Sequence, residues 1–224
     1  MKVTLIDSMG SDLFVVNAAR VSFHKESKYI IANNNNTYEN IDWVLSDSDV
    51  KLITYLAKHN HWSPFAHCFL SFRVKAPIFV ARQLVKHQVG LTWNEVSRRY
   101  VDEEPEYWFP NKWRGRPTNG MKQGSSDVEF KDHELATVDQ LIEDLNTTYL
   151  LLCSKGLAPE QARMILPQNM MTEWIWSGSL MAFARICKLR LDPHAQAETR
   201  EIAEFFDKEC SQIFPVSWKA LMEN

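Results

Sequence analysis

The sequence predicts an α+β fold in a single domain, residues 1–224, with a central, mostly antiparallel sheet flanked by helices. The 224 residues and 45% hydrophobic content suffice for one substantial core, and no Pro-, Gly- or Ser-rich linker divides the chain. Several short segments alternate polar and apolar residues, as strands with one buried face do. Longer segments carry apolar residues at helical spacing, and the two kinds of segment are mixed along the chain.

The N-terminal part begins with a strand pattern and continues with two helix patterns. Residues 2–7 alternate apolar and polar side chains, which predicts a strand. Ser11 or Asp12 can cap the first helix, and one of residues 47–49 can cap the second. Residues 24–46 include four consecutive asparagines and cannot bury much apolar area, so we expect a surface loop there.

A strand and a helix lead into the most polar stretch of the chain. Residues 68–75 alternate as a half-buried strand does, and a proline at position 77 favours a helix over residues 77–88. Helical spacing would place Gln83, Lys86 and His87 on one face.

The next stretch should be extended. A glycine at position 90 permits the helix to end. If residues 94–100 form an extended segment, Glu95, Ser97 and Arg99 share one side. Together with the preceding helix face, this polar side predicts a site for an anion, although a solvated helix and a charged loop explain the pattern equally well.

The C-terminal half contains the clearest helix. Residues 103–130 predict a long loop with order at 107–110, and the mixture of aromatic and basic residues there can stack a pterin or a base, or belong to a mobile excursion at a subunit boundary. Residues 133–155 carry apolar side chains at helical spacing. A short helix starting at position 159, a strand over 172–176 and a helix capped by Ser177 or Ser179 should follow.

Composition limits the class of protein. A net charge of −3 and a pI near 6.2 argue against general binding to nucleic acid. No apolar run approaches the roughly 18 residues of a membrane span, and the N-terminus lacks the pattern of a signal peptide, so we expect a cytoplasmic protein. Three histidines at positions 59, 61 and 67 lack a carboxylate or thiolate at metal-ligand spacing, so we expect no metal.

The four cysteines predict buried thiols rather than reactive ones. They lie far apart in apolar patterns and form no Cys-x-x-Cys pair. None is close in sequence to the Arg and His residues that would lower a thiol pKa. A reaction that depends on a cysteine nucleophile is therefore not expected.

One run of residues resembles the signature of a known enzyme family. Residues 94–100, NEVSRRY, with His87 upstream, are similar to the Arg-His-Arg and Asn-Glu-x-Ser-x-Arg signature of the flavin-dependent thymidylate synthases. Two departures stand out. Lys86, His87 and Gln88 occupy the place of Arg-His-Arg, and the eight residues that separate Gln88 from Ser97 are one more than in the family.

Further segments resemble the same family in the same order along the chain. They are NAARVSF at 17–23, HWSPFAH at 61–67, ARMILP at 162–167 and RLDPHAQAE at 190–198. The last matches the family pattern Arg-x-Asp-x-His-Ala-Gln-x-Glu. Agreement of separate motifs along one chain is harder to obtain by chance than one motif alone.

The resemblance implies a reaction and its co-substrates. Members of the family convert dUMP to dTMP, with methylenetetrahydrofolate as carbon donor and FAD, reduced by NADPH, as hydride source. In such a reaction the flavin performs the redox chemistry and the protein supplies binding and orientation. The family also builds each site from several subunits of a homotetramer.

The resemblance assigns residues to dUMP. They are Gln83, Lys86, Glu95, Ser97, Arg98, Arg99, Arg163 and Arg190. The hydroxyl and guanidinium groups at positions 97–99 and 163 suit the phosphate. Arg190 would stabilise negative charge on the uracil ring and is the expected catalytic residue. Gln83 can pair with the uracil edge through one donor and one acceptor, and Glu95 would orient the arginines or the ribose.

A second set is assigned to FAD. It comprises His61, Ser63, Lys86, His87, Gln88, Glu95, Ser179 and Arg185. Gln88 lacks the positive charge of the family's arginine, and Arg185 stands where the family has asparagine, so we expect Arg185 to restore that charge. The same departures leave open a nucleotide-binding homologue that has lost flavin chemistry. A nucleic-acid-binding module that uses residues 107–116 is opposed by the acidic net charge.

Overall fold

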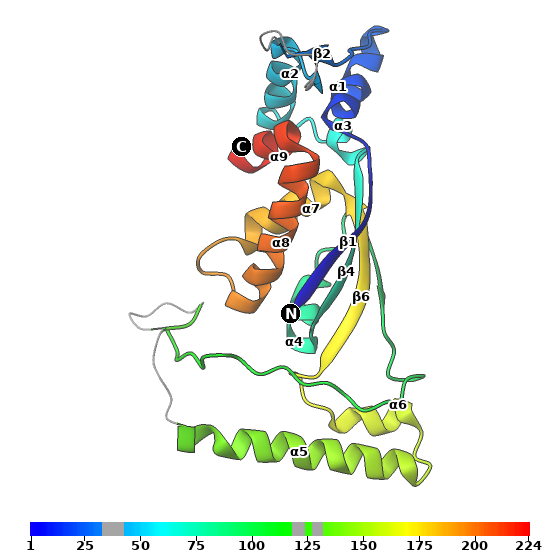
Figure 1. The fold of residues 1–224 in the computed structure, drawn as a ribbon, viewed down its shortest axis with the longest axis vertical. Helices are drawn as coiled ribbons and strands as arrows, with labels where there is room; N and C mark the ends of the chain where they lie inside the picture. The colour runs from blue at the N-terminus through cyan, green and yellow to red at the C-terminus, as the bar shows by residue number, and fades with distance from the viewer. Residues whose placement is uncertain (33–42, 118–123, 127–131) are drawn as a thin grey trace, which may run out of the picture.

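The fold is built on a four-stranded antiparallel sheet (Figure 1). The computed structural model describes residues 1–32, 43–117, 124–126 and 132–224. The strands are β1 (Lys2–Met9), β4 (Phe69–Pro77), β6 (Met171–Ser179) and β5 (Leu91–Glu95), in the order β1-β4-β6-β5. All three pairings are antiparallel. The expected α+β class with an antiparallel sheet is thus confirmed.

Helices cover one face of this sheet. They are α4 (Ile78–Leu84), α7 (Leu180–Arg190) and α8 (Ala197–Ile213). Helix α9 (Pro215–Glu223) packs on α2, α7 and α8, and α1 (Asp12–Arg20), α2 (Asp47–Lys58) and α3 (Ser63–Ala66) lie beyond the end of the sheet (Figure 1). Alternate residues of β4 and β6 are buried beneath α4, α7 and α8, as strands with a period of two require. Phe72 and Trp176 are fully buried, and Phe206 of α8 contacts both rings.

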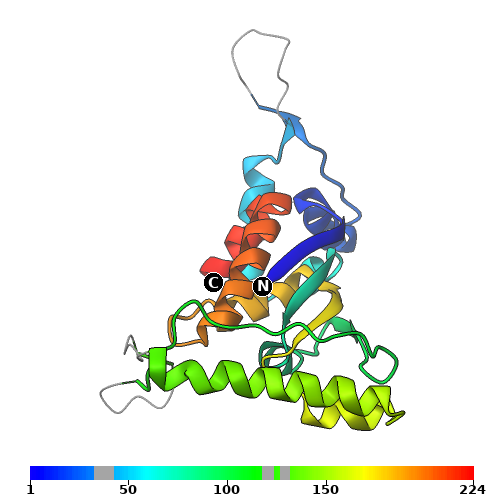
Figure 2. The ribbon, with the colours of Figure 1, turned by 60° about the horizontal axis from the view of Figure 1, so that its bottom comes forward.

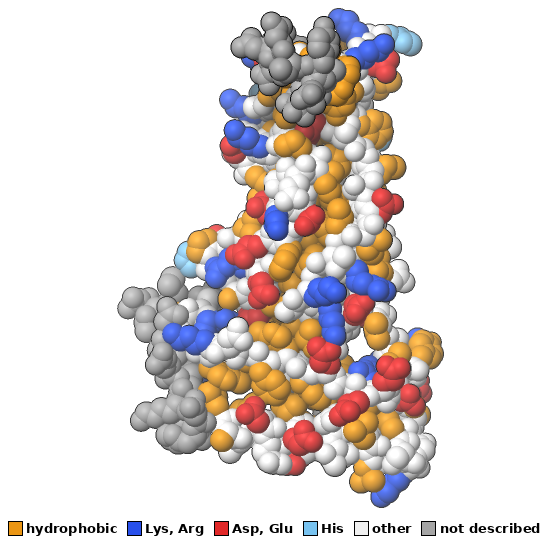
Figure 3. All heavy atoms as spheres, in the orientation of Figure 1, with side chains coloured by type: hydrophobic (Ala, Val, Ile, Leu, Met, Phe, Trp, Pro, Cys, Tyr) orange, Lys and Arg blue, Asp and Glu red, His pale blue; other side chains and the backbone are white. Residues whose placement is uncertain are grey.

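A long helix forms a separate layer at the base of the molecule. Helix α5 (Asp132–Ser154) confirms the helix expected over 133–155, and it packs against α6 (Pro159–Ala162) and the 3-10 turn Arg163–Ile165. Figure 2 shows α5 running across the base with α6 beside it. Figure 3 shows apolar side chains gathered between α5 and the extended segment above it. None of the helices described is long and apolar enough to cross a membrane.

Several expected boundaries were wrong. The helix expected over 77–88 ends at Leu84, and Pro77 lies before its first turn in extended conformation. Lys86 and His87 therefore do not share a helix face with Gln83. Only the start of the extended segment expected over 94–100 is extended, because strand β5 ends at Glu95. A turn follows, in which the backbone N–H of Tyr100 donates to the backbone carbonyl of Ser97 at 3.0 Å.

Caps were predicted more successfully than loops. Ser11 caps α1 and Ser179 caps α7, as expected, but Ser46 rather than a residue of 47–49 caps α2. The surface loop expected over 24–46 contains a short ribbon of β2 (Ile30–Ile31) and β3 (Trp43–Val44). Its asparagines at 33–36 lie outside the described residues.

The segment expected as a long loop, 103–130, is anchored in two places. Tyr107 forms a β-bridge with Met170, and the backbone N–H of Trp108 donates to the backbone carbonyl of Asn169 at 2.9 Å. These contacts confirm the expected order at 107–110. Gly115 pairs with Ser126, so the described part of the segment folds back on itself. Residues 118–123 and 127–131 of this segment lie outside the described residues.

Candidate functional site

Helix α7 positions the first group of candidate residues. Ser179 ends β6 and caps α7, with its Oγ accepting from the Ala182 N–H at 3.2 Å. From this fixed start, the helix carries Arg185 on its exposed face and ends at Arg190. The sheet register places Ser179 opposite Phe69, next to the end of α3. One helix therefore connects candidates assigned to the cofactor with the candidate catalytic arginine.

Arg190 is held by two groups from the segment that follows β4. Its Nε donates to Nε2 of His87 at 3.1 Å, and one terminal nitrogen lies 3.5 Å from the backbone carbonyl of Gln83. Burial, and then the positive charge of Arg190, lower the pKa of His87, so the ring is neutral and can accept the hydrogen bond. Burial also lowers the pKa of Arg190, but a guanidinium stays charged.

Gln83 and Arg190 line the same cleft. The cleft has a volume of about 520 Å³ and lies beside the loop that joins α7 to α8. His194 lines it from this loop, and Arg114 and Ser125 line it from the segment between β5 and α5. Gln83 and Arg190 were both assigned to dUMP from the sequence, whereas Arg114 and Ser125 were not singled out.

Other candidates for dUMP line a different pocket. Glu95, Arg98 and Arg163 border a pocket of about 380 Å³ where β5 ends and β6 begins. The Glu95 carboxylate is fixed there, because it accepts from the Thr172 hydroxyl at 2.7 Å and from the Trp93 indole at 3.1 Å. This pocket shares no lining residue with the cleft of Gln83 and Arg190.

The turn after β5 carries the remaining phosphate candidates at the surface. Arg99 stacks on the Tyr100 ring, with its guanidinium carbon 4.9 Å from the ring centroid, and also donates to the Tyr100 hydroxyl at 2.7 Å. Its Nε lies 3.4 Å from Oγ of Ser97. These exposed donors lie beside each other in sequence, so an anion can contact several of them at once.

Within one chain, the candidate dUMP residues therefore fall into two groups. Figure 1 shows α6, next to Arg163, on the opposite side of the molecule from the loop between α7 and α8 that follows Arg190. Figure 2 shows the same separation after rotation. Arg163 and Arg190 thus line two different pockets.

The candidate flavin residues surround α7. His61 and Ser63 are exposed at the start of α3, which packs against α7. Lys86 and Gln88 are exposed in the turn after α4. Lys86 and Arg185 make no hydrogen bond or ion pair with any part of the chain that the structure describes, so both cations are available to an anionic group such as a diphosphate. Glu95, assigned to both ligands, lies instead in the pocket with Arg163.

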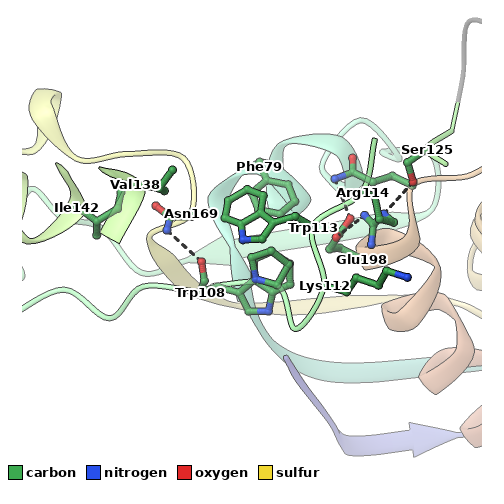
Figure 4. Close-up of a pocket in the computed structure, with 12 residues that line it drawn as sticks. Phe79, Trp108, Lys112, Trp113, Arg114, Ser125, Val138, Ile142, Asn169 and Glu198 are labelled. Carbon is green, nitrogen blue, oxygen red and sulfur yellow. Dashed lines mark hydrogen bonds and ion pairs between the residues drawn. The ribbon is translucent and has the colours of Figure 1, made fainter. Parts of the chain in front are cut away.

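A third pocket has aromatic walls. It has a volume of about 380 Å³ and includes Phe79 and Trp108, whose rings meet edge to face at 5.6 Å (Figure 4). At its polar end Arg114 forms an ion pair at 2.5 Å with the buried Glu198. Glu198 was part of the RLDPHAQAE motif, and its pairing with Arg114 could not be read from spacing, because the two are 84 positions apart.

The thiols and histidines do not form a further site in the described residues. Cys68, Cys187 and Cys210 are buried, and Cys153 is half-buried, which corrects the expectation that all four are buried. Burial raises the pKa of Cys68 to about 11 and raises the pKa of Cys187 well above its ordinary value. No group of three His, Cys, Asp or Glu side chains in the described part of the chain could hold a metal.

Comparison with known proteins identifies the family. The family model described as thymidylate synthase complementing protein matches residues 4–216. The flavin-dependent thymidylate synthase of Thermus thermophilus is 35% identical over 222 residues, covering 99% of this chain and 76% of the relative. That of Thermosipho africanus is 33% identical, covering 94% and 87%. The chain belongs to the flavin-dependent thymidylate synthase family.

Solved structures give the same answer for the fold. The UMP/dUMP methylase PolB from Streptomyces cacaoi, bound with 5-Br dUMP, has a TM-score of 0.79 at 28% identity, covering 99% of this chain and 94% of PolB. Its complex with 5-Br UMP has a TM-score of 0.82, also at 28% identity, covering 99% and 93%. This flavin-dependent thymidylate synthase family member is thus a methyltransferase with the expected fold, and flavin is the cofactor of its family.

Proposed function

We propose that the protein converts dUMP to dTMP, with methylenetetrahydrofolate as carbon donor and NADPH as the reductant of bound FAD. Family membership and the methylase neighbours support this activity. The observation that carries the proposal is the environment of Arg190. It contacts the neutral His87 and a carbonyl, and it meets no carboxylate among the residues described. Its charge is therefore left for a ligand in the cleft.

Arg190 suits the stabilisation of a developing anion. Three of the four thiols are buried, so no cysteine nucleophile is expected to attack the uracil ring. Without such a nucleophile, a cation must activate the ring. A fixed guanidinium in a half-buried cleft stabilises negative charge on N3 and the carbonyl oxygens of uracil more strongly than a mobile cation in water does. His87 and the carbonyl of Gln83 fix its position.

The remaining candidates bind and orient. Ser97, Arg98, Arg99 and Arg163 supply hydroxyl and guanidinium donors for the phosphate, and Lys86 adds a further cation. Glu95 is fixed by Thr172 and Trp93, so it offers a carboxylate of defined orientation to an arginine or a ribose hydroxyl.

The residues around α7 fit a flavin dinucleotide. Lys86, His87, Gln88, His61, Ser63, Ser179 and Arg185 would hold it, and the exposed cations suit its diphosphate. When bound, the flavin supplies the hydride that completes the methyl group. The protein's part is to hold this group beside the cleft in which Arg190 lies.

Arg185 should supply the charge that Gln88 lacks. Arg185→Ala is expected to weaken FAD binding by about tenfold, as the loss of one charge-assisted hydrogen bond does. Lys188→Ala is the matched control, because Lys188 is an exposed cation on the same helix but is not among the family's flavin positions. Quenching of flavin fluorescence measures both affinities. Equal affinity of Arg185→Ala and the parent protein would remove this role.

The division of the dUMP residues supports a homotetramer with shared sites. Arg190 and Arg163 lie in separate pockets of one chain. A second copy that places its Arg163 pocket against the Arg190 cleft would bring both groups to one nucleotide. Oligomers of identical chains commonly form such sites at their interfaces.

The decisive experiment is release of tritium from dUMP labelled at C5, with and without FAD. We expect release that requires both FAD and methylenetetrahydrofolate, and its loss in Arg190→Gln, which keeps a polar side chain but no charge. UMP is the comparison substrate, because PolB is a UMP/dUMP methylase. Binding of dUMP without flavin absorbance or tritium release would instead support a nucleotide-binding homologue that has lost flavin chemistry.

A further inference from the structure

The Gln83 side chain accepts a hydrogen bond from a buried residue that does not line the cleft. Thr199, in the first turn of α8, is fully buried, and its hydroxyl donates to Oε1 of Gln83. Helix α4, which carries Gln83, packs against α8. Gln83 lines the cleft with Arg190, whereas Thr199 is not among the residues that border it. Thr199 can therefore influence a ligand only through Gln83.

This contact decides which end of the amide faces the cleft. A glutamine amide has one acceptor oxygen and one NH₂ group with two donors. Because Oε1 is engaged by Thr199, the NH₂ group remains for the cleft. The neighbouring Arg190 has donors only. This wall of the cleft therefore offers donors and no side-chain acceptor from these two residues.

We propose that Thr199 is a positioning residue that fixes the Gln83 amide with its NH₂ group toward the cleft. The group of the nucleotide that meets Gln83 is then an acceptor oxygen, either of the phosphate or of a uracil carbonyl, and not a ring N–H. This assignment rests on the proposed function for its ligand. It replaces the expectation that Gln83 pairs with uracil through one donor and one acceptor.

The test compares Thr199→Val with Thr199→Ser. Valine has nearly the shape of threonine but no donor, whereas serine keeps the hydroxyl. Thr199→Val should weaken dUMP binding roughly fivefold, the effect of losing one neutral hydrogen bond that orients a binding group. Thr199→Ser keeps the hydroxyl and should bind dUMP as the parent protein does. Titration calorimetry gives both affinities. Equal binding by the valine variant and the parent protein would contradict the proposal.

A comparison of dUMP with deoxyuridine, which lacks the phosphate, shows whether Gln83 contacts a phosphate oxygen or a uracil carbonyl. If Gln83 meets the phosphate, Thr199→Val weakens binding of dUMP but not of deoxyuridine. If Gln83 meets a carbonyl of the base, the variant weakens binding of both by the same factor. Either result supports a donor directed to the cleft.

A second variant tests the direction of the amide and does not depend on the valine variant folding. Gln83→Glu can still accept from Thr199, but it presents an anionic acceptor to the cleft. We expect it to bind dUMP at least tenfold more weakly than the parent protein, because two acceptors would then face each other. Retained binding by Gln83→Glu would show that an acceptor faces the nucleotide and would overturn the proposal.

A measurement without nucleotide keeps this proposal separate from the proposed function. In the proposed orientation, the Gln83 NH₂ protons of the ligand-free parent protein face solvent in the cleft and exchange rapidly with deuterium, as nitrogen-15 NMR of labelled glutamine can measure. Slow exchange that becomes rapid in Thr199→Val would mean that NH₂ donates to Thr199, against the proposal. A parent protein with rapid exchange but no affinity for dUMP would contradict the proposed function alone.

Discussion

At the scale of single residues, the site depends on the pairing of a cation with an uncharged imidazole. Arg190 donates to His87, so the imidazole must be unprotonated at that nitrogen. Burial first, and the charge of Arg190 second, keep the His87 pKa below its ordinary value. The arginine thus stabilises the form of the histidine that holds it, and the pair forms one unit.

Because His87 must be neutral in this pair, we expect stability and dUMP binding to fall at acid pH. A histidine whose folded-state pKa is lowered contributes fully to stability above its ordinary pKa of about 6.5 and loses that contribution as the pH falls toward the lowered value. We expect dUMP binding to weaken on the same acid side, because a protonated His87 cannot accept from Arg190. Titration of the His87 ring by proton NMR checks this. In Arg190→Gln its pKa should rise, but only in part, because burial remains; an unchanged pKa would refute the pairing.

The cysteines give a second prediction at this scale. Raised pKa values keep the Cys68, Cys187 and Cys210 thiols protonated at neutral pH, and a protonated thiol is a poor nucleophile. Each cysteine replaced singly by alanine should retain turnover per folded molecule, with a loss of about 1–2 kcal/mol in the free energy of unfolding at the buried positions. Rates normalised to the folded fraction provide the measurement. A folded variant without turnover would show that a thiol takes part.

At the scale of elements, the turn between α4 and β5 shows why local patterns were insufficient. The sequence favoured a helix up to position 88, but α4 ends at Leu84. The chain must turn there because β5 pairs with β6, with Leu91 opposite Gly178. Trp93 stacks on Trp174 at 4.3 Å and holds the pair together. This pairing joins segments about eighty residues apart, which helical periodicity does not reveal.

Gly90 closes this turn and allows a matched comparison. Its φ is +77°, and a Cβ there would lie 3.2 Å from Oγ of Ser179 and 3.3 Å from Cβ of Ala182. Gly156 has a φ of +85° with nothing within 4 Å of a Cβ. Both alanine variants should lose about 1–2 kcal/mol through backbone strain.

Gly90→Ala should lose more than Gly156→Ala, because its Cβ also crowds the N-terminus of α7. It should also weaken FAD binding, because the flavin candidates Lys86 and Gln88 lie in the same turn. Urea unfolding measures the stability difference and fluorescence quenching measures the affinity. Equal losses in stability together with unchanged affinity would mean that the turn tolerates the side chain and does not order the flavin residues.

Motif residues were found more reliably from the sequence than their neighbours in space. Arg190 and His87 were singled out by motif, and the structure brings them to 3.1 Å. Arg114 and Thr199 were missed, because each acts through a contact with a residue far along the chain. Their side chains are ordinary in type, so only the packing of α8 against the rest of the molecule identifies them.

At the scale of the whole molecule, the candidate dUMP residues of one chain lie in two groups. Arg163 and Arg190 line different pockets of one chain. A motif in a sequence fixes a position in the chain but not the copy of the chain in which it acts. Two inactive variants, Arg163→Ala and Arg190→Ala, can therefore restore each other if a site takes one arginine from each of two subunits.

Mixed oligomers test this arrangement. After co-expression in equal amounts, random assembly should leave both arginines intact in about a quarter of the sites, so tritium release should recover to about a quarter of the parental rate. Gln83→Ala mixed with Arg190→Ala is the matched control, because these two residues line one cleft of one chain. Every site in that mixture carries one defect, and no recovery is expected. Failure of the first pair to exceed the control would mean that the two arginines do not act on the same nucleotide from different subunits.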